Sequence, residues 1–106
     1  MINQGYYITS KGEKVIIDYQ EYIRLSNKNI VELILPSGVK NVWCHNNQIK
    51  ELLLPSGIQN VYCENNNITG LILPAGIRNV SCDDGAIKDP IIYKDWDSNI
   101  KIYFYK

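Results

Sequence analysis

Apolar and polar residues alternate in short stretches along the middle of the chain. In Leu33-x-Leu35 and Val42-x-Cys44 the apolar residues are two positions apart, which is the spacing of side chains on one face of a β-strand. No long stretch between such segments has the spacing of an amphipathic helix. The pattern therefore predicts short strands with Leu, Val and Cys side chains pointing inward, and little or no helix.

These stretches recur with a constant period. The isoleucines at positions 30, 49, 68 and 87 follow one another at a 19-residue interval. The same interval relates the other anchors of the repeat, which are Leu33, Leu52 and Leu71; Leu35, Leu54 and Leu73; Pro36, Pro55 and Pro74; Gly38, Gly57 and Gly76; Val42, Val61 and Val80; and Cys44, Cys63 and Cys82. A unit this short cannot bury its own apolar side, so the copies must stack as the coils of a solenoid.

The copies of the repeat set the number of coils and the position of the corners. Three full copies, flanked by imperfect ones around Ile23 and Ile100, predict about five coils whose equivalent segments pair as parallel strands about 4.8 Å apart. One corner of each coil is Pro-Ser-Gly or Pro-Ala-Gly, in which glycine is free to adopt a positive φ. The other corner is rich in asparagine.

Both ends of the array carry segments that can cover it. Residues 6–9 and 14–17 predict a β-hairpin around the turn at Gly12, and residues 91–93 and 100–105 predict a final pair of strands. A chain of 106 residues has enough apolar surface for one core. We therefore expect one domain, with an N-terminal cap at 1–19, repeats at 20–87 and a C-terminal cap at 88–106.

The repeat resembles that of a known family. The segment Val39-x-x-Val42-x-Cys44-x-x-Asn47-x-Ile49 looks like the conserved L-x-x-L-x-L-x-x-N-x-L segment of leucine-rich repeats, and the copy beginning at Ile58 matches it equally well. The trailing Leu-x-Leu-Pro is similar to the short class of these repeats found in bacterial and viral proteins. The resemblance implies a right-handed solenoid whose inner parallel sheet is the ligand-binding face.

The resemblance also assigns a role to one asparagine of each repeat. In the family this asparagine caps backbone groups of the adjacent coil, which corresponds to Asn47 and Asn66 in this chain. The third copy has Gly85 at the equivalent position, and the first, partial copy has Lys28. We therefore expect a ladder of two asparagines and a looser turn after Cys82.

Charge and cysteine content restrict the classes of partner. Eleven basic and eleven acidic residues give a net charge of zero, which argues against nucleic acid as a partner. No apolar run is long enough to span a membrane, and the chain does not begin with a signal-peptide pattern. Three cysteines, an odd number, favour free thiols in a reducing compartment. These features predict a cytoplasmic protein, with association with a virion as an alternative.

The outward-pointing residues of the inner strands are the best candidates for a binding site. Alternation places Arg24, Trp43, Tyr62, Ser81 and Lys101 in the middle of that face, and Trp, Tyr and Arg are the residue types that dominate interface hot spots. Aromatic residues also pair across strands for stability alone. We expect a protein partner to contact eight residues of this face, namely Arg24, Trp43, His45, Tyr62, Glu64, Ser81, Asp83 and Lys101.

Two further columns suggest chemistry or structure. The asparagines at 41, 60, 79 and 99 are expected to hydrogen-bond along the stack. His45, Glu64 and Asp83 could in principle bind a divalent ion or transfer protons, but no nucleophile or pocket accompanies them in the sequence, so a solvated column is favoured. The cysteine column is expected to pack in the core rather than bind metal.

The sequence thus predicts a non-enzymatic protein-binding module without a metal or cofactor, of adaptor or inhibitor type. The alternative is a structural subunit of a larger assembly, such as a phage or viral particle or a homo-oligomer. In that alternative the terminal strand with Tyr103, Phe104 and Tyr105 is the expected contact.

Overall fold

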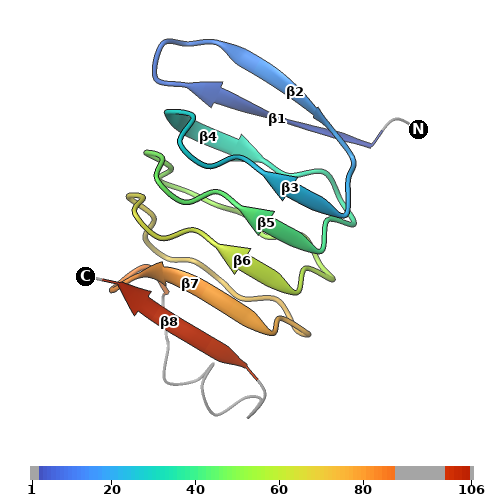
Figure 1. The fold of residues 1–106 in the computed structure, drawn as a ribbon. Helices are drawn as coiled ribbons and strands as arrows, with labels where there is room; N and C mark the ends of the chain where they lie inside the picture. The colour runs from blue at the N-terminus through green and yellow to red at the C-terminus, as the bar shows by residue number, and fades with distance from the viewer. Residues whose placement is uncertain (1–2, 88–99, 106) are drawn as a thin grey trace.

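The computed structural model describes residues 3–87 and 100–105 of the chain. The regular structure of these residues consists of eight strands and no helix. The strands are β1 (Gln4–Thr9), β2 (Lys14–Asp18), β3 (Tyr22–Arg24), β4 (Ile30–Ile34), β5 (Asn41–Trp43), β6 (Asn60–Tyr62), β7 (Asn79–Asp83) and β8 (Lys101–Tyr105). β1 and β2 form a hairpin at one end, and the other strands belong to coils that lie one below another, as Figure 1 shows.

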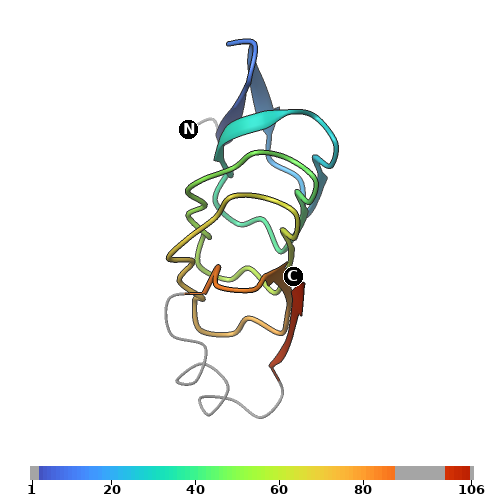
Figure 2. The same ribbon diagram turned by 90° about the vertical axis from the view of Figure 1, so that its left-hand side faces the viewer.

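A five-stranded parallel sheet forms one side of the stack. Its strand order is β3-β5-β6-β7-β8, and equivalent residues of the repeats face one another, as Val42 does Val61 and Val61 does Val80. The chain is therefore a β-solenoid of about four turns. This confirms the parallel solenoid predicted from the 19-residue period. Figure 2 shows the coils edge on, with the sheet on one side and the outer segments on the other.

The inside of the solenoid is filled by the anchors of the repeat. Val42, Val61 and Val80 of the sheet side and Leu33 and Leu71 of the outer side are almost completely buried. Burying one such side chain contributes roughly 1.5–3 kcal/mol relative to leaving it exposed. Because each coil presents the same anchors to the next, the core continues through the stack without a break.

The outer segments are extended but pair little with one another. Among the described residues they form two isolated parallel bridges, Leu33 with Leu52 and Leu71 with Ile87. Continuous parallel strands were expected on this side too. A proline follows each Leu-x-Leu, as Pro55 follows Leu54, and its missing N–H group removes a donor from the ladder.

The N-terminal hairpin forms as predicted and caps the first coil. β1 and β2 pair antiparallel, and β1 also pairs antiparallel with the outer strand β4, giving a second sheet of order β2-β1-β4. Gly5 makes this contact possible. A Cβ atom at Gly5 would clash with the carbonyl oxygen of Ile34 and lie 2.9 Å from Cδ of Pro36.

The predicted C-terminal strand is present, but its register differs from the prediction. β8 pairs parallel with β7 so that Lys101 faces Asn79 and Tyr103 faces Ser81. The sequence suggested Lys101 opposite Ser81, a shift of two positions. Both registers point Ile102 inward, so alternation alone cannot distinguish them. The strand expected at 91–93 and the turn at 95–98 lie outside the described residues.

The two kinds of corner have the backbone geometry that their residues favour. Gly38, Gly57 and Gly76 have φ between 86° and 88°. At the opposite corner Asn27, Asn46 and Asn65 have φ between 58° and 60°. Asparagine tolerates this left-handed region better than most residues, which explains why both corners repeat so closely.

Candidate functional site

Three columns of side chains cover the solvent-facing side of the parallel sheet. We call this surface the inner face because it belongs to the sheet that the sequence analysis predicted as the inner one. The first column is Tyr22, Asn41, Asn60, Asn79 and Lys101; the second is Arg24, Trp43, Tyr62, Ser81 and Tyr103; the third is Ser26, His45, Glu64, Asp83 and Tyr105. The structure thus brings all eight predicted contact residues onto one face. Lys101 moves from the second column to the first because of the register of β8.

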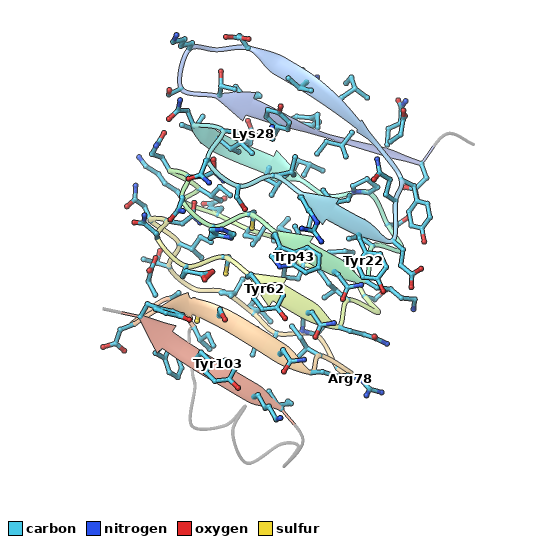
Figure 3. The ribbon with its side chains drawn as sticks, viewed as in Figure 1. Tyr22, Lys28, Trp43, Tyr62, Arg78 and Tyr103 are labelled. Carbon is cyan, nitrogen blue, oxygen red and sulfur yellow. The ribbon has the colours of Figure 1, made fainter. Side chains whose placement is uncertain are left out.

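Aromatic rings stack across the middle of the inner face. The ring centroids of Trp43 and Tyr62 are 5.3 Å apart with an angle of 14° between the planes, and Tyr22 stacks on Trp43 at 6.2 Å and 23°. The guanidinium carbon of Arg24 lies 4.9 Å from the centroid of the Trp43 ring. Figure 3 shows the three rings side by side, with Tyr103 further along the face.

The side chains of the second column and its neighbour Tyr22 differ in their exposure to solvent. Trp43 and Tyr62 are half-buried, whereas Tyr22 is 56% exposed and Tyr103 53%. Ser81, in contrast, is 5% exposed. Tyr103 was expected on this face only at its far end, and the register of β8 places it in the second column, opposite Ser81. Ser81 is less accessible than the alternation alone suggests.

The asparagine column of the inner face forms the predicted amide ladder. Nδ2 of Asn60 donates to Oδ1 of Asn41, and Nδ2 of Asn79 donates to Oδ1 of Asn60 at 2.6 Å. Asn99, the expected fourth member, lies outside the described residues, and Lys101 faces Asn79 instead. The ladder uses the amide groups within the protein, so we regard this column as structural.

The motif asparagines cap backbone groups between coils as the resemblance implied. Oδ1 of Asn47 accepts hydrogen bonds from the N–H groups of Lys28 and Ile30, both at 3.0 Å, and its Nδ2 donates to the carbonyl of Leu25 at 2.9 Å. Oδ1 of Asn66 likewise accepts from the N–H of Ile49 at 3.0 Å. The predicted two-member ladder is therefore present.

Asp83 takes over part of the role of the missing third asparagine. Its Oδ1 accepts from the N–H of Asn65 at 2.7 Å and its Oδ2 from the N–H of Asn66 at 2.8 Å. Asn66 precedes Gly85 by one repeat, just as Lys28 precedes Asn47 by one repeat. Asp83 thus supplies the acceptor that Gly85 lacks, and its carboxylate is directed at the backbone rather than left free on the face.

His45 and Glu64 stand in the same column but do not form a metal cluster. Nδ1 of His45 and Oγ of Ser26 are 3.1 Å apart, within hydrogen-bonding distance. Oε1 of Glu64 is buried and has no hydrogen-bond partner among the described residues. No group of three or more His, Cys, Asp or Glu side chains in residues 3–87 and 100–105 is arranged to hold a metal ion.

A shallow hollow opens at the first-coil end of the inner face. It has a volume of about 350 Å³ and is lined by Arg24, Ser26, Lys28, Trp43 and His45. Lys28 was not among the predicted contacts. The signal in the sequence was its position, since Lys28 replaces the motif asparagine and is therefore free to point outward.

The three cysteines are free thiols buried in the core, as predicted. Burial, together with the nearby charge of Glu64, raises the pKa of Cys44 from its ordinary 9.0 to about 12. Burial and the charge of Asp83 raise the pKa of Cys82 to about 12. The pKa of Cys63, between the other two thiols, is also raised, mainly by burial. Thiols held in this neutral form are poor nucleophiles and poor metal ligands.

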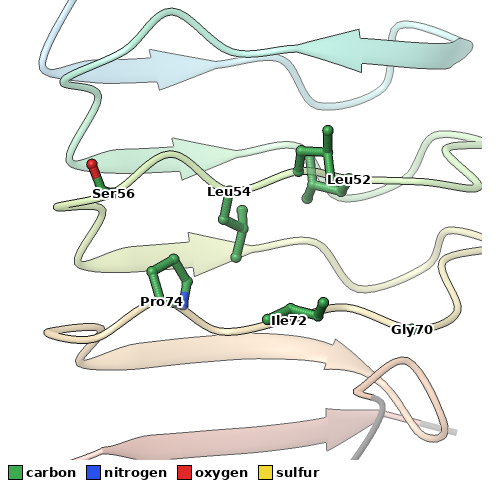
Figure 4. Close-up of a pocket in the computed structure, with 7 residues that line it drawn as sticks. Leu52, Leu54, Ser56, Gly70, Ile72 and Pro74 are labelled. Carbon is green, nitrogen blue, oxygen red and sulfur yellow. The ribbon is translucent and has the colours of Figure 1, made fainter.

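The outer side of the solenoid carries a second column that the sequence analysis did not single out. Leu53 is 76% exposed and Ile72 is 60% exposed, and Ile34 continues the same column at the repeat interval. A groove of about 370 Å³ lies beside them, between Leu52–Leu54 of one coil and Gly70, Ile72 and Pro74 of the next (Figure 4). The outward position in Leu-x-Leu was the signal, because alternation directs the middle residue to solvent.

Comparisons with protein-family models, with curated proteins and with solved structures find no match for this chain. In the described part of the chain no helix is long and apolar enough to cross a membrane.

Proposed function

We propose that this chain is a non-enzymatic binding module of the leucine-rich-repeat type, whose inner face binds a protein partner. The repeat motif supports the family assignment, and so do the hydrogen bonds of Asn47 and Asn66, which join neighbouring coils as the motif requires. A fold alone does not determine function, so the argument for binding depends on the face itself.

The stack of Tyr22, Trp43 and Tyr62 is the observation on which the proposal depends. The rings hold one another in place, and Arg24 packs on the same tryptophan. Side chains ordered before binding lose little conformational entropy when a partner arrives. A rigid aromatic cluster with a cationic neighbour has the composition of an interface hot spot.

The third column of the face supports binding rather than catalysis. The Asp83 carboxylate accepts two backbone hydrogen bonds, and a ring nitrogen of His45 lies within hydrogen-bonding distance of Ser26. These groups are engaged with the protein on a nearly flat sheet, whereas acid–base catalysis needs groups directed into a cleft.

The size of the inner face limits the affinity. Five coils about 4.8 Å apart, each contributing three side chains over about five residues of extended chain, give a face of roughly 20 by 15 Å. This is smaller than the area of a standard interface. We therefore expect either a transient complex or a contact that also includes an end of the solenoid.

The test is affinity capture from an extract of the source cells with three versions of the immobilised chain. These are the unchanged protein, the variant Trp43→Ala/Tyr62→Ala, and the outer-face control Leu53→Ser/Ile72→Ser. Because stacked rings contribute roughly 1 kcal/mol beyond their burial, the aromatic variant must first be shown to be folded by circular dichroism. A captured protein is accepted as a partner only if, after purification, it also binds the purified chain.

We expect the partner to bind the unchanged protein and the outer-face control with similar Kd, and the aromatic variant at least tenfold more weakly. A partner that binds all three folded versions equally would contradict the proposal.

Self-association as a structural subunit is the second candidate, and the outer side favours it. Exposed apolar residues that gather on a surface often mark contact sites, and Leu53 and Ile72 occupy equivalent positions on adjacent coils and line the same groove. Light scattering at two protein concentrations distinguishes the candidates. A discrete oligomer that Leu53→Ser/Ile72→Ser converts to monomer would favour the outer face, and one lost in a Tyr103→Ser/Tyr105→Ser variant would favour the terminal strand.

A further inference from the structure

The hollow at the first-coil end of the inner face has a one-sided charge. Its lining contains the cations Arg24 and Lys28, the imidazole of His45 and the hydroxyl of Ser26, and it contains no acidic residue. Arg24 ends β3 and Trp43 ends β5, so these donors come from two adjacent coils and converge where both strands finish. The sheet register holds the two coils together, which fixes the relative positions of the donors.

No described residue of the protein neutralises the two cations. Arg24 and Lys28 are exposed and form no ion pair with any residue in 3–87 or 100–105. Arg24 packs on the Trp43 ring, and such packing orients the guanidinium plane while leaving its N–H groups available. An oriented guanidinium binds a carboxylate with two parallel hydrogen bonds.

The rest of the face limits which anion can bind here. Glu64 and Asp83 lie in the third column beyond His45, so this column is negative immediately beyond the hollow. A nucleic acid strand laid along the sheet would place its phosphates against those carboxylates. A protein segment avoids this repulsion, because it can present one acidic side chain to the hollow and apolar side chains to the ring stack.

From this charge complementarity we propose that the hollow lined by Arg24, Ser26, Lys28, Trp43 and His45 binds an Asp or Glu carboxylate of the protein partner. The proposal rests on the proposed function and adds the chemistry of the partner. Arg24 and Lys28 bind the carboxylate oxygens, and Trp43 packs against the apolar part of the same segment.

The test uses the full chain, labelled with nitrogen-15, and three probes followed by NMR. The probes are the blocked tripeptide acetyl-Ala-Glu-Ala-amide, its counterpart with Gln in place of Glu, and inorganic phosphate. The test variant is Arg24→Gln/Lys28→Gln. The matched control is Lys50→Gln/Arg78→Gln, which removes the same charge from two exposed residues outside the hollow. Figure 3 shows Arg78 far from Lys28 on the face.

We expect the Glu peptide to shift the amide signals of Ser26, Lys28 and His45 and the indole N–H of Trp43 in a saturable way. The Kd should rise about tenfold in Arg24→Gln/Lys28→Gln, as two exposed charge interactions are lost, and change less than twofold in the control variant. The Gln peptide should bind at least about tenfold more weakly than the Glu peptide, because it lacks the charge.

Three results would overturn the proposal. They are equal binding of the Glu and Gln peptides, an unchanged Kd in Arg24→Gln/Lys28→Gln, and phosphate binding at these residues without peptide binding. The outcome is separable from that of the capture experiment. Peptide binding that depends on Arg24 and Lys28, together with a partner insensitive to Trp43→Ala/Tyr62→Ala, would leave the two cations as a carboxylate site. It would reject both the ring stack as the binding surface and the packing of Trp43 against the partner.

Discussion

The carboxylate of Asp83 accepts a hydrogen bond from the backbone N–H of Asn66 at 2.8 Å, across the junction between two coils. In the first repeat an asparagine two positions later in the repeat performs this role, as Asn47 does for the N–H of Lys28. The solenoid thus keeps the cap of its third coil although the sequence has glycine at position 85.

The substitution Asp83→Ala should lower the free energy of unfolding by about 1–3 kcal/mol, because the N–H groups of Asn65 and Asn66 lose their acceptors. Urea unfolding followed by circular dichroism measures this. The control is Asp84→Ala, which removes a neighbouring exposed carboxylate. Equal losses in the two variants would show that Asp83 acts through its charge alone and not through the cap.

The substitution Asn47→Ala should be more damaging, with a loss of about 3 kcal/mol or more, because Asn47 is buried and its side chain joins backbone groups of two coils. Asn46→Ala is the comparison, and the positive φ of Asn46 adds about 1 kcal/mol of backbone strain to that variant. Asn46 is exposed, and its side chain accepts a single hydrogen bond, from Asn65. Thermal unfolding of both variants gives the difference, and a Tm for Asn47→Ala above that of Asn46→Ala would contradict the capping role.

The substitution Gly5→Ala should detach the N-terminal hairpin from the first coil, since the added methyl group meets the carbonyl oxygen of Ile34. Hydrogen exchange measured by NMR should then show faster exchange of the β1 and β4 amides, with the amides of β6 unchanged. Gly12→Ala is the matched control. Its Cβ would meet no atom within 4 Å, so the cost is limited to the strain of a positive φ, about 1 kcal/mol. Unaltered protection of β4 in Gly5→Ala would show that the cap tolerates a side chain there.

The raised pKa values of the thiols make the stability depend on alkaline pH. Below about pH 9 the cysteines are neutral in both folded and unfolded chains. Between 9.0 and about 12 the unfolded chain loses these protons while the folded chain keeps those of Cys44 and Cys82. The free energy of unfolding should therefore fall by about 1.4 kcal/mol per pH unit for each thiol.

Urea unfolding at several pH values from 8 to 11, compared with a Cys44→Ala/Cys63→Ala/Cys82→Ala variant, isolates this effect, since tyrosine ionisation is common to both chains. The variant should be less stable at pH 8 and show the shallower decline. Parallel curves for the two proteins would mean that the thiols ionise equally in the folded and unfolded states.

Much of the fold could be predicted from the sequence because the constant repeat period determines which coil lies on each side of a given coil. Once Val42, Val61 and Val80 align, the in-register parallel sheet and the buried cysteines follow. The hairpin at 4–18 was readable as well, from its alternation and its glycine turn. Its pairing with β4 was not, because nothing local indicates which strand an edge will join.

The candidate site was predictable as a face but not in its details. Alternation placed Trp43 and Tyr62 together, whereas the position of Lys101 depended on the register of β8, which the repeat period does not fix. The capping role of Asp83 required knowing where the backbone N–H of Asn66 lies in space. Lys28 became a candidate only when the structure placed it beside Arg24 and His45.

The unbroken repeat interval makes the length of this protein adjustable one coil at a time. Removal of residues 50–68 would join Ile49 to Thr69, leave every anchor in phase, and shorten the inner face by about 4.8 Å. In-frame recombination between the repeated gene segments produces the same change. A chain with more or fewer copies would then have the same end hollow and caps at a different separation. The number of repeats therefore determines the distance between the two ends of the solenoid without a change of fold.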